Sequence, residues 1–500
     1  MDFEQIPGSW AVPGSYTEIR EVAAPGTLVG MPLRCVLVGQ ISGGTGVANT
    51  VYSSLTAAQA VALFGAGSAV AQSVAAFLKE EPTLTIDAVG VAPADGSVAA
   101  SASLKFEGTA TSGGTMAAIL GGYRVAFTVT SGMTAAEAAQ AFVAACNSSA
   151  ANAAVSYLKA ETGLSATLGS DGVTVTVQSW EKGAFTGQYD VRVSSASYDQ
   201  VDGLSLAVTP MAGGAGLPDV TPALQALGGT WYTDLILLLN DQPNITAAQA
   251  EAKSRENAMT AKDMRIWVGF SGTQSQILAL TQTFSTAEEI VLIAEQAPRW
   301  SPWIAAAVAG AEGAQALNSD PSRQLQGVVL TGLAGLGPDA GDQFTPIQRN
   351  VLLHGGCTTL KFNRDGTVSF ERVVTTRQVN PTSGLALDGP WNVMIPAINA
   401  RVRYEWNAYY AENYQRAKLA DVGSSLENVP GVVTVRTLKA SWVAQSLLYQ
   451  AQGWIDDVET LGPQAVFERD SLDRNRVNST LPIKPMGSLI VLANILQSQV

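Results

Sequence analysis

The sequence predicts an α/β fold with a doubly wound sheet, a β-rich domain inserted into it, and extended arms at both ends. Three patterns in the 500 residues support this prediction. After residue 217, short continuous apolar runs alternate with helical segments, which is typical of a parallel sheet covered on both faces. Between residues 96 and 215, the strands instead alternate in polarity with period two. The first 25 residues are interrupted by Pro–Gly pairs, which favour an extended or turning arm.

Composition excludes several classes of protein. Only 14% of the residues are charged, against about 25% in a usual soluble chain. The net charge of −13 argues against a nucleic-acid binder, which needs a basic surface. At 47% hydrophobic, the chain is also too apolar to be disordered. The longest apolar run, residues 300–311, contains Pro302 and is too short for a membrane helix. The acidic start Met-Asp-Phe-Glu predicts no secretory signal peptide.

Residues suited to catalysis are scarce. His354 is the single histidine, and it stands between an apolar run and a glycine turn, where we interpret it as structural rather than as a general base. Cys35, Cys146 and Cys357 have no metal-ligand or disulfide spacing, so we expect buried thiols. The sequence therefore predicts no catalytic residue, no metal site, no cofactor and no enzyme activity.

One glycine-rich stretch has the outline of a phosphate-binding loop. Gly39-Gln-Ile-Ser-Gly43-Gly44-Thr45 follows an apolar strand, but it lacks the lysine that would reach a phosphate. We interpret this stretch as a turn that ends the strand.

Residues 26–95 are predicted to form the first part of the α/β core. An apolar run at residues 34–39 indicates a buried strand, and residues 84–91 indicate a second. Between them, one helix starts after a cap at Thr56 and another spans residues 69–79.

The inserted β-rich domain is assigned to residues 96–215. Its helix, residues 134–146, begins with a capping box in which Thr134 is followed three positions later by Glu137. Period-two alternation predicts strands at residues 104–107, 123–129 and 173–177. We expect this domain to fold independently, so that the α/β core would still form without it.

Residues 217–380 are assigned to the main α/β domain. Strands are predicted at residues 234–239, 264–270 and 289–294, with helices at 245–261 and 273–284. Asn244 or Thr246 is the expected cap of the first helix. The domain ends in a hairpin, residues 357–362 with 368–375, which turns at Asp365-Gly366.

The last part of the chain has a mixed character. Residues 381–486 are assigned to a helical or mixed domain, with a long helix at residues 391–419. Its aromatic side chains favour a core position, and a face docked on a partner is the alternative. Residues 487–500 form a terminal arm whose apolar strand, residues 488–496, needs a pairing partner to avoid aggregation. The aromatic side chains are Tyr404, Trp406, Tyr409, Tyr410 and Tyr414.

These segments together resemble the contractile phage tail sheath proteins of the Mu-like type. The likeness follows the chain in order over nearly its whole length. The segments that carry it are residues 12–18 (Val-Pro-Gly-Ser-Tyr-Thr-Glu), 34–40, 64–68, 108–110, 121–125 and 353–359 with 368–376.

The resemblance implies a structural protein with a subtilisin-like α/β domain. Such subunits polymerise as hexameric rings around an inner tail tube, and the sheath contracts to drive the tube through a cell envelope. The expected partners are sheath subunits of the same and adjacent rings, the tail tube, the baseplate and the tail terminator, with no nucleic acid and no membrane insertion. The expected location is the contractile tail of a virion assembled in the host cytoplasm. The inserted domain is expected on the outside of the sheath.

The resemblance also suggests which residues make contacts. The terminal arms would add strands to a neighbouring subunit through Pro13, Gly14, Tyr16, Glu18, Leu489, Ile490, Val491 and Leu492. A candidate tube-facing helix carries Arg401, Arg403, Arg416 and Lys418. Two rival classes remain open: a non-motor structural or adhesive surface protein, and an enzyme built on the α/β domain.

Overall fold

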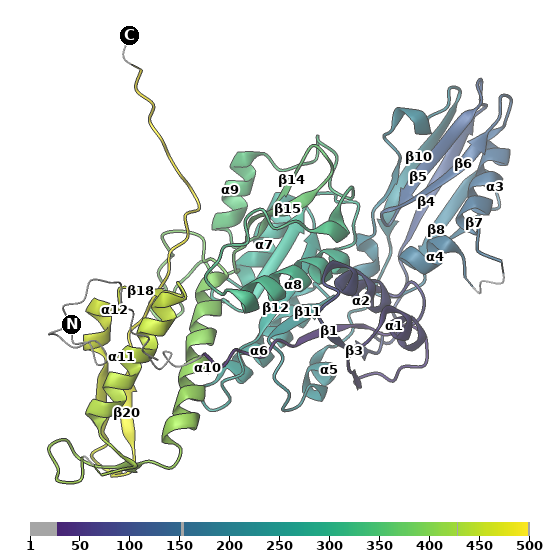
Figure 1. The fold of residues 1–500 in the computed structure, drawn as a ribbon. Coiled ribbons are helices and arrows are strands. Elements are labelled where there is room, and N and C mark those ends of the chain that lie inside the picture. Colours follow the sequence, from purple (N-terminus) through teal and green to yellow (C-terminus); the bar gives the residue numbers. More distant parts are fainter. Residues whose placement is uncertain (1–27, 152–154, 428, 499–500) are drawn as a thin grey trace, which may run out of the picture. The chain divides into compact units, whose positions relative to one another are not determined.

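The computed structural model describes residues 28–151, 155–427 and 429–498 (Figure 1). Contacts divide these residues into a larger unit, residues 32–403 with 485–498, and a smaller unit, residues 28–31 with 404–484. The predicted amino-terminal arm, residues 1–25, lies outside the described residues.

A six-stranded sheet forms the centre of the larger unit. Its order is β13-β12-β11-β1-β3-β2; the first five strands are parallel, and β2 pairs antiparallel with β3. The adjacent strands β1 and β11 come from opposite sides of the inserted domain in the sequence, so the sheet needs both parts of the chain. The strands are β1 Cys35–Gln40, β2 Val51–Tyr52, β3 Ile86–Val91, β11 Asp234–Leu237, β12 Arg265–Ser271 and β13 Ile290–Glu295.

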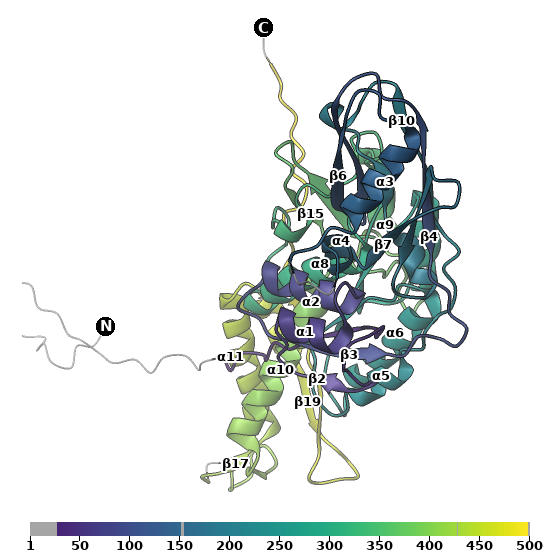
Figure 2. The same cartoon turned by 90° about the vertical axis from the view of Figure 1, so that its right-hand side faces the viewer.

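Helices cover both faces of this sheet. Because parallel crossovers are right-handed and the chain runs in opposite directions from β1 and from β11, α2 lies on one face and α6 and α7 on the other. Helix α8 packs on α2, β11 and β12, so it covers the face of α2 (Figures 1 and 2). This arrangement confirms the predicted α/β class. The helices are α1 Ala57–Phe64, α2 Ala69–Glu80, α5 Thr221–Ala226, α6 Gln242–Glu256, α7 Gln274–Thr283 and α8 Pro302–Ser319.

Helix α8 packs unusually closely on the sheet. A Cβ atom at Gly313 would lie 2.1 Å from the ring of Trp267, so only glycine admits this buried indole. The Trp267 Nε1 group donates to Asp234 Oδ1 at 2.9 Å, which satisfies its single donor. The apolar run at residues 300–311 extends into this helix, and no helix in the described ranges is long and apolar enough to cross a bilayer.

The predicted bounds of helix α6 are wrong. The helix begins at Gln242 rather than residue 245 and ends at Glu256 rather than residue 261. Its cap is Asp241, whose side chain accepts from Asn244 N at 3.1 Å. Pro243 lies in the first turn. Proline has no backbone N–H group, and a helix offers no partner for that group in its first turn, so the helix can start before the predicted caps.

In its described residues, the inserted domain has two antiparallel sheets and two α-helices, with strand orders β10-β4-β8-β7 and β6-β5-β9. Its core is a cluster of Phe106, Phe127 and Phe142, whose ring centroids lie 5.7–5.9 Å apart. The predicted capping box of α3 is present, since Thr134 and Glu137 exchange hydrogen bonds. The elements are β4 Ser101–Gly108, β5 Gly114–Leu120, β6 Tyr123–Val129, α3 Ala135–Cys146, α4 Tyr157–Thr162, β7 Leu164–Leu168, β8 Thr174–Ser179, β9 Val191–Val193 and β10 Leu204–Ala212.

The predicted hairpin at the end of the α/β domain is confirmed. Strands β14 (Thr359–Phe362) and β15 (Val368–Arg372) pair antiparallel. Thr358 N donates to Leu292 O at 2.9 Å, so the hairpin continues the central sheet beyond β13. Helix α9 (Pro346–His354) precedes it.

The smaller unit is built on aromatic side chains. Trp406 lies on α10 (Met394–Tyr414), which continues into this unit from residue 403. Its ring is 5.1 Å from Trp442 of α11 (Val435–Ala451) and 6.4 Å from Phe467. Trp406 is half-buried in this aromatic cluster, whereas Tyr410 is exposed. The remaining elements are β16 Lys418–Leu419, β17 Val432–Val433, β18 Ile455–Asp456, α12 Val458–Leu461, β19 Val466–Arg469, β20 Val477–Thr480 and β21 Lys484–Pro485.

The long helix is shorter than predicted. It ends at Tyr414 instead of residue 419. Lys418 N donates to Gly431 O and Ala420 N to Val433 O, at 2.7 and 3.0 Å. These backbone donors therefore form a strand ladder and cannot continue the helix.

A buried carboxylate lies at the end of β13. Glu295 is 2% exposed, and its Oε2 atom has no hydrogen-bond partner among the described residues. Burial raises the pKa of Glu295 to about 8, although the nearby Arg349 lowers it. Arg349 is itself paired with Glu371 at 2.9 Å, so it compensates only part of the desolvation cost.

Replacing Glu295 by Gln should therefore stabilise the folded protein at alkaline pH. The raised pKa means that the folded chain binds more protons than the unfolded chain between about pH 4.5 and 8, so stability falls as pH rises through this window. We expect Glu295→Gln to raise the free energy of unfolding by on the order of 2–4 kcal/mol at pH 9 and by less than about 1 kcal/mol at pH 5. Urea unfolding at both pH values measures this difference. The exposed Glu459→Gln is the control, and an equal effect of Glu295→Gln at both pH values would contradict the expectation.

Candidate assembly site

The carboxy-terminal segment is extended and exposed. After β21, residues 486–498 form no helix and no strand within the described chain. Leu489, Val491 and Leu492 are 71%, 77% and 70% exposed, whereas Ile490 is half-buried. Gln324 Nε2 donates to Leu489 O at 2.8 Å, which holds the start of the segment on the larger unit. The predicted terminal strand thus has its apolar side chains free for a contact outside this chain.

The amino-terminal contact residues Pro13, Gly14, Tyr16 and Glu18 lie outside the described residues. The described residues begin at residue 28, in the smaller unit. Val29 N and Gly30 N donate to the carboxylate of Glu405 at 2.8 and 3.1 Å. Glu405 is buried on α10. Sequence reasoning missed this role, because a glutamate in a helical stretch gives no sign of a partner that is 376 positions away.

The four basic residues of the candidate tube-facing helix do not share one helical surface. Arg403 donates to Glu256 O at 2.8 Å and forms an ion pair with Asp263, so its charge is directed at the core of the larger unit. Arg401 is half-buried on the same helix. Arg416 and Lys418 are exposed but follow the end of α10.

The smaller unit presents a two-stranded hairpin, β19 with β20. Within the described residues each of these strands pairs on one side only, so the other edge keeps free backbone donors and acceptors. Asp470 fixes the turn by accepting from Leu472 N, Asp473 N and Asn478 Nδ2 at 2.8–3.0 Å. These bonds lower the pKa of Asp470 to about 2. The hairpin is therefore a preformed edge to which a further strand could be added.

The candidate catalytic groups are not assembled into a site. His354 is exposed at the last residue of α9. Cys35, Cys146 and Cys357 are buried and unpaired, and burial raises the pKa of the Cys146 thiol to about 12. In the described part of the chain, no three His, Cys, Asp or Glu side chains are grouped so that they could hold a metal ion.

The family comparisons agree with these features. A family model of the phage tail sheath protein central domain matches residues 213–376. The chain is 26% identical over 489 residues to the Mu-like prophage FluMu tail sheath protein of Haemophilus influenzae, covering 96% of this chain and 95% of that protein.

Two solved structures are similar in outline. The sheath tail protein of Desulfitobacterium hafniense is 13% identical, with a TM-score of 0.45 and coverage of 95% of this chain and 97% of that one. The helical sheath of the anti-feeding prophage in its contracted state is 9% identical, with a TM-score of 0.47 and coverage of 98% and 99%. The sequence comparisons confirm the predicted resemblance: residues 213–376 match the model of the phage tail sheath protein central domain, and the chain is similar along nearly its whole length to a Mu-like prophage tail sheath protein.

Proposed function

We propose that this chain is the structural subunit of a contractile tail sheath that polymerises as hexameric rings around a tail tube and drives the tube through a cell envelope. The observation that carries the proposal is the exposed, extended apolar segment at residues 486–498. In this proposal, the sheath contacts the baseplate at one end and the tail terminator at the other. The subunits would assemble in the host cytoplasm and act in the virion.

The composition of the segment favours contact with a second copy of this chain. Residues 485–500 contain no Asp, Glu, Lys or Arg. Ile495 and Leu496 are 90% and 96% exposed. Each fully buried aliphatic side chain would contribute roughly 1.5–3 kcal/mol, so burying the apolar side chains of this segment is a large gain for assembly.

The acceptor we propose is the β19–β20 hairpin of a neighbouring subunit. Isolated two-stranded hairpins are marginally stable, and a third strand increases their stability. The added strand would satisfy its own backbone groups at the same time. Extended arms can keep this pairing while the connections between subunits change direction, which suits a lattice that contracts without separating.

No part of this mechanism requires a catalytic step. The free energy would be stored in the subunit contacts of the extended lattice and released as many subunits change together. The low share of charged residues, 14%, suits a surface that is largely occupied by subunit contacts.

Deleting residues 487–500 should prevent polymerisation without unfolding the subunit. We expect unchanged circular dichroism, because residues 487–498 form no helix or strand, and we expect no striated tubes or stacked rings by electron microscopy. Val491→Lys with Leu492→Lys should have the same effect, since the charges oppose burial. Met259→Lys is the matched control because Met259 is 94% exposed on a different surface. Normal tubes from the deletion variant would exclude strand addition through this arm; deletion of residues 1–20 tests the other arm in the same assay.

His354 provides a test of the non-enzymatic function. Because this side chain is exposed at the end of α9, His354→Gln should change the free energy of unfolding by less than about 1 kcal/mol. The variant should form full-length sheaths that contract as readily as the wild type. Sheaths that assemble but no longer contract would show that the imidazole has a functional role.

A further inference from the structure

One segment of the inserted domain enters the α/β core where a ligand would bind in many related folds. Open α/β sheets bind ligands at the carboxyl ends of the strands, at the point where the strand order reverses. Here that point lies between β1 and β11. It is occupied by residues 180–189, which connect β8 with β9 and which we name the bridging segment.

The bridging segment is bonded to both strands of the reversal point. Gln40 Nε2, at the end of β1, donates to Lys182 O at 2.8 Å. Asn240, which follows β11, exchanges two hydrogen bonds of 2.7 Å with the side chain of Gln188. These contacts close the crevice with residues of the same chain.

Glu181 takes the position that an anion would have. Its side chain is fully buried; Oε1 accepts from Ser42 Oγ and Oε2 from Ala69 N, both at 2.7 Å. Ala69 is the first residue of α2, whose positive end favours a negative charge. Burial raises the pKa of Glu181 to about 7, while these two hydrogen bonds lower it.

The glycine-rich stretch after β1 makes room for the neighbouring indole. A Cβ atom at Gly43 would lie 2.7 Å from the Trp180 ring, and one at Gly65 would lie 2.4 Å from it. The Nζ group of Lys159 lies 4.9 Å above the same ring. Gly43, in the stretch that resembles a phosphate-binding loop, and Gly65 therefore admit Trp180, and the Glu181 carboxylate lies beside this ring in place of a phosphate.

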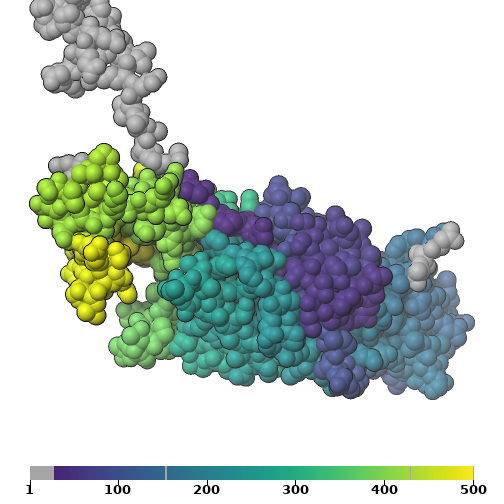
Figure 3. All heavy atoms as spheres, turned by 90° about the horizontal axis from the view of Figure 1, so that it is seen from below, coloured from purple at the N-terminus to yellow at the C-terminus, as the bar shows by residue number. Residues whose placement is uncertain are grey.

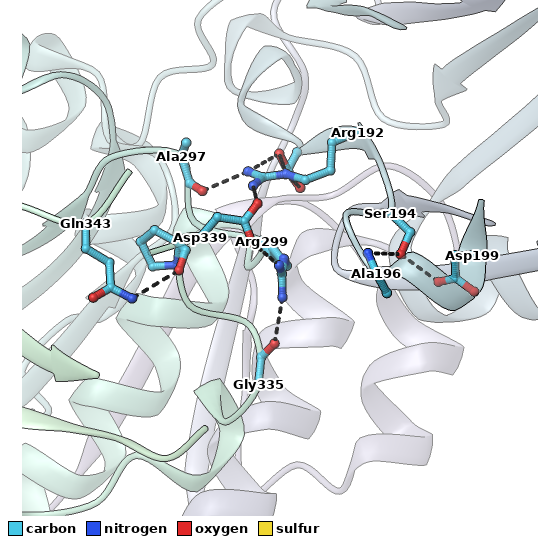
Figure 4. A network of polar contacts seen from close by, with 11 residues as sticks. Arg192, Ser194, Ala196, Asp199, Ala297, Arg299, Gly335, Asp339 and Gln343 are labelled. Carbon is cyan, nitrogen blue, oxygen red and sulfur yellow. Dashed lines mark hydrogen bonds and ion pairs between the residues drawn. The ribbon is translucent and has the colours of Figure 1, made fainter. Parts of the chain in front are cut away.

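The contact continues beyond the crevice. Phe185 and Tyr189 cover the buried Trp303 of α8, with ring centroids at 5.7 and 4.8 Å. Arg192 of β9 then donates to Ala297 O at 2.8 Å and pairs with Asp339 at 3.2 Å (Figure 4). In the space-filling view, the inserted domain adjoins the first core segment (Figure 3).

We propose that the bridging segment couples the inserted domain to the α/β core, with Glu181 as the essential polar contact, so that the two unfold as one cooperative unit. Removing the carboxylate leaves the buried Ala69 N without its acceptor and also removes the partner of the half-buried Ser42 hydroxyl. This coupling revises the expectation that the core forms without residues 96–215, because excision would leave Ala69 N, Asn240 and Trp303 without these contacts.

Two of the three buried cysteines allow the coupling to be measured in the full-length chain. Cys146 of α3 reports on the inserted domain, and Cys35 of β1 reports on the core. We would follow their alkylation by mass spectrometry in increasing urea. In the wild type, both thiols should become reactive at the same urea concentration. In Glu181→Ala, the ratio of the two labelling rates should change by ~10-fold or more, and the two midpoints should separate.

Two controls make the result specific. Glu137→Ala removes a helix-cap contact of the same domain and should shift both midpoints without separating them. Sodium acetate should restore coincident labelling in Glu181→Ala, since its carboxylate can accept from Ser42 and Ala69, whereas equimolar sodium chloride should not. If the alanine variant is not recovered folded, Glu181→Gln, which keeps one acceptor, should show a smaller separation that acetate does not reverse. Coincident labelling in the Glu181 variants, or separate midpoints in the wild type, would overturn the proposal.

Discussion

The pairing of β1 with β11 is the contact on which the larger unit depends. Cys35 lies opposite Asp234 in this pair, and the whole inserted domain separates the two strands in the sequence. Asp234 is fully buried, yet its carboxylate accepts from Arg265 Nε, Arg265 Nη2 and Trp267 Nε1 at 2.9–3.1 Å. A buried charge with such complete hydrogen bonding is tolerated, and it links β11 to β12 beside the β1–β11 pair.

This pairing also determines where the inserted domain can attach. The chain leaves the sheet after β3, the neighbour of β1, and returns at β11, so the inserted domain is connected to strands on both sides of β1. In an enzyme, this point would be left open for a ligand. Here it is occupied by Glu181 and Trp180, whose buried contacts are with the core itself. The same topology that could have formed a binding site therefore serves to join two domains.

The sequence was informative wherever a local pattern determines the structure. Thr134 and Glu137 lie within one helical turn, and the strands of the central sheet are continuous apolar runs, so both could be predicted. Helix α8 was not predicted, because its many Ala and Gly residues show little periodicity when the helix is buried on nearly every side. The end of α10 at Tyr414 was missed because it depends on pairing with Gly431 and Val433. The apolar composition of residues 489–492 predicted a contact with a neighbouring subunit, and this contact stays a prediction.

Contacts between distant residues were beyond the reach of such patterns. Glu181 and Ala69 are 112 positions apart, and nothing beside either residue indicates the other. Gly43 is the part of this contact that the sequence shows, in a stretch that we interpreted as a turn, because a glycine indicates only that another group can approach closely. The glycine does not show which group approaches, because Trp180 and Glu181 come from the inserted domain. The terminal segment differs in a physical way. Burying the Glu181 carboxylate is costly, so it needs hydrogen-bond donors within the same chain. Residues 485–500 carry no charged side chain, so a second molecule can bury them without this cost. A subunit with charged contacts between its domains and apolar contacts at its end would stay rigid within itself while its connection to a neighbour remains extended.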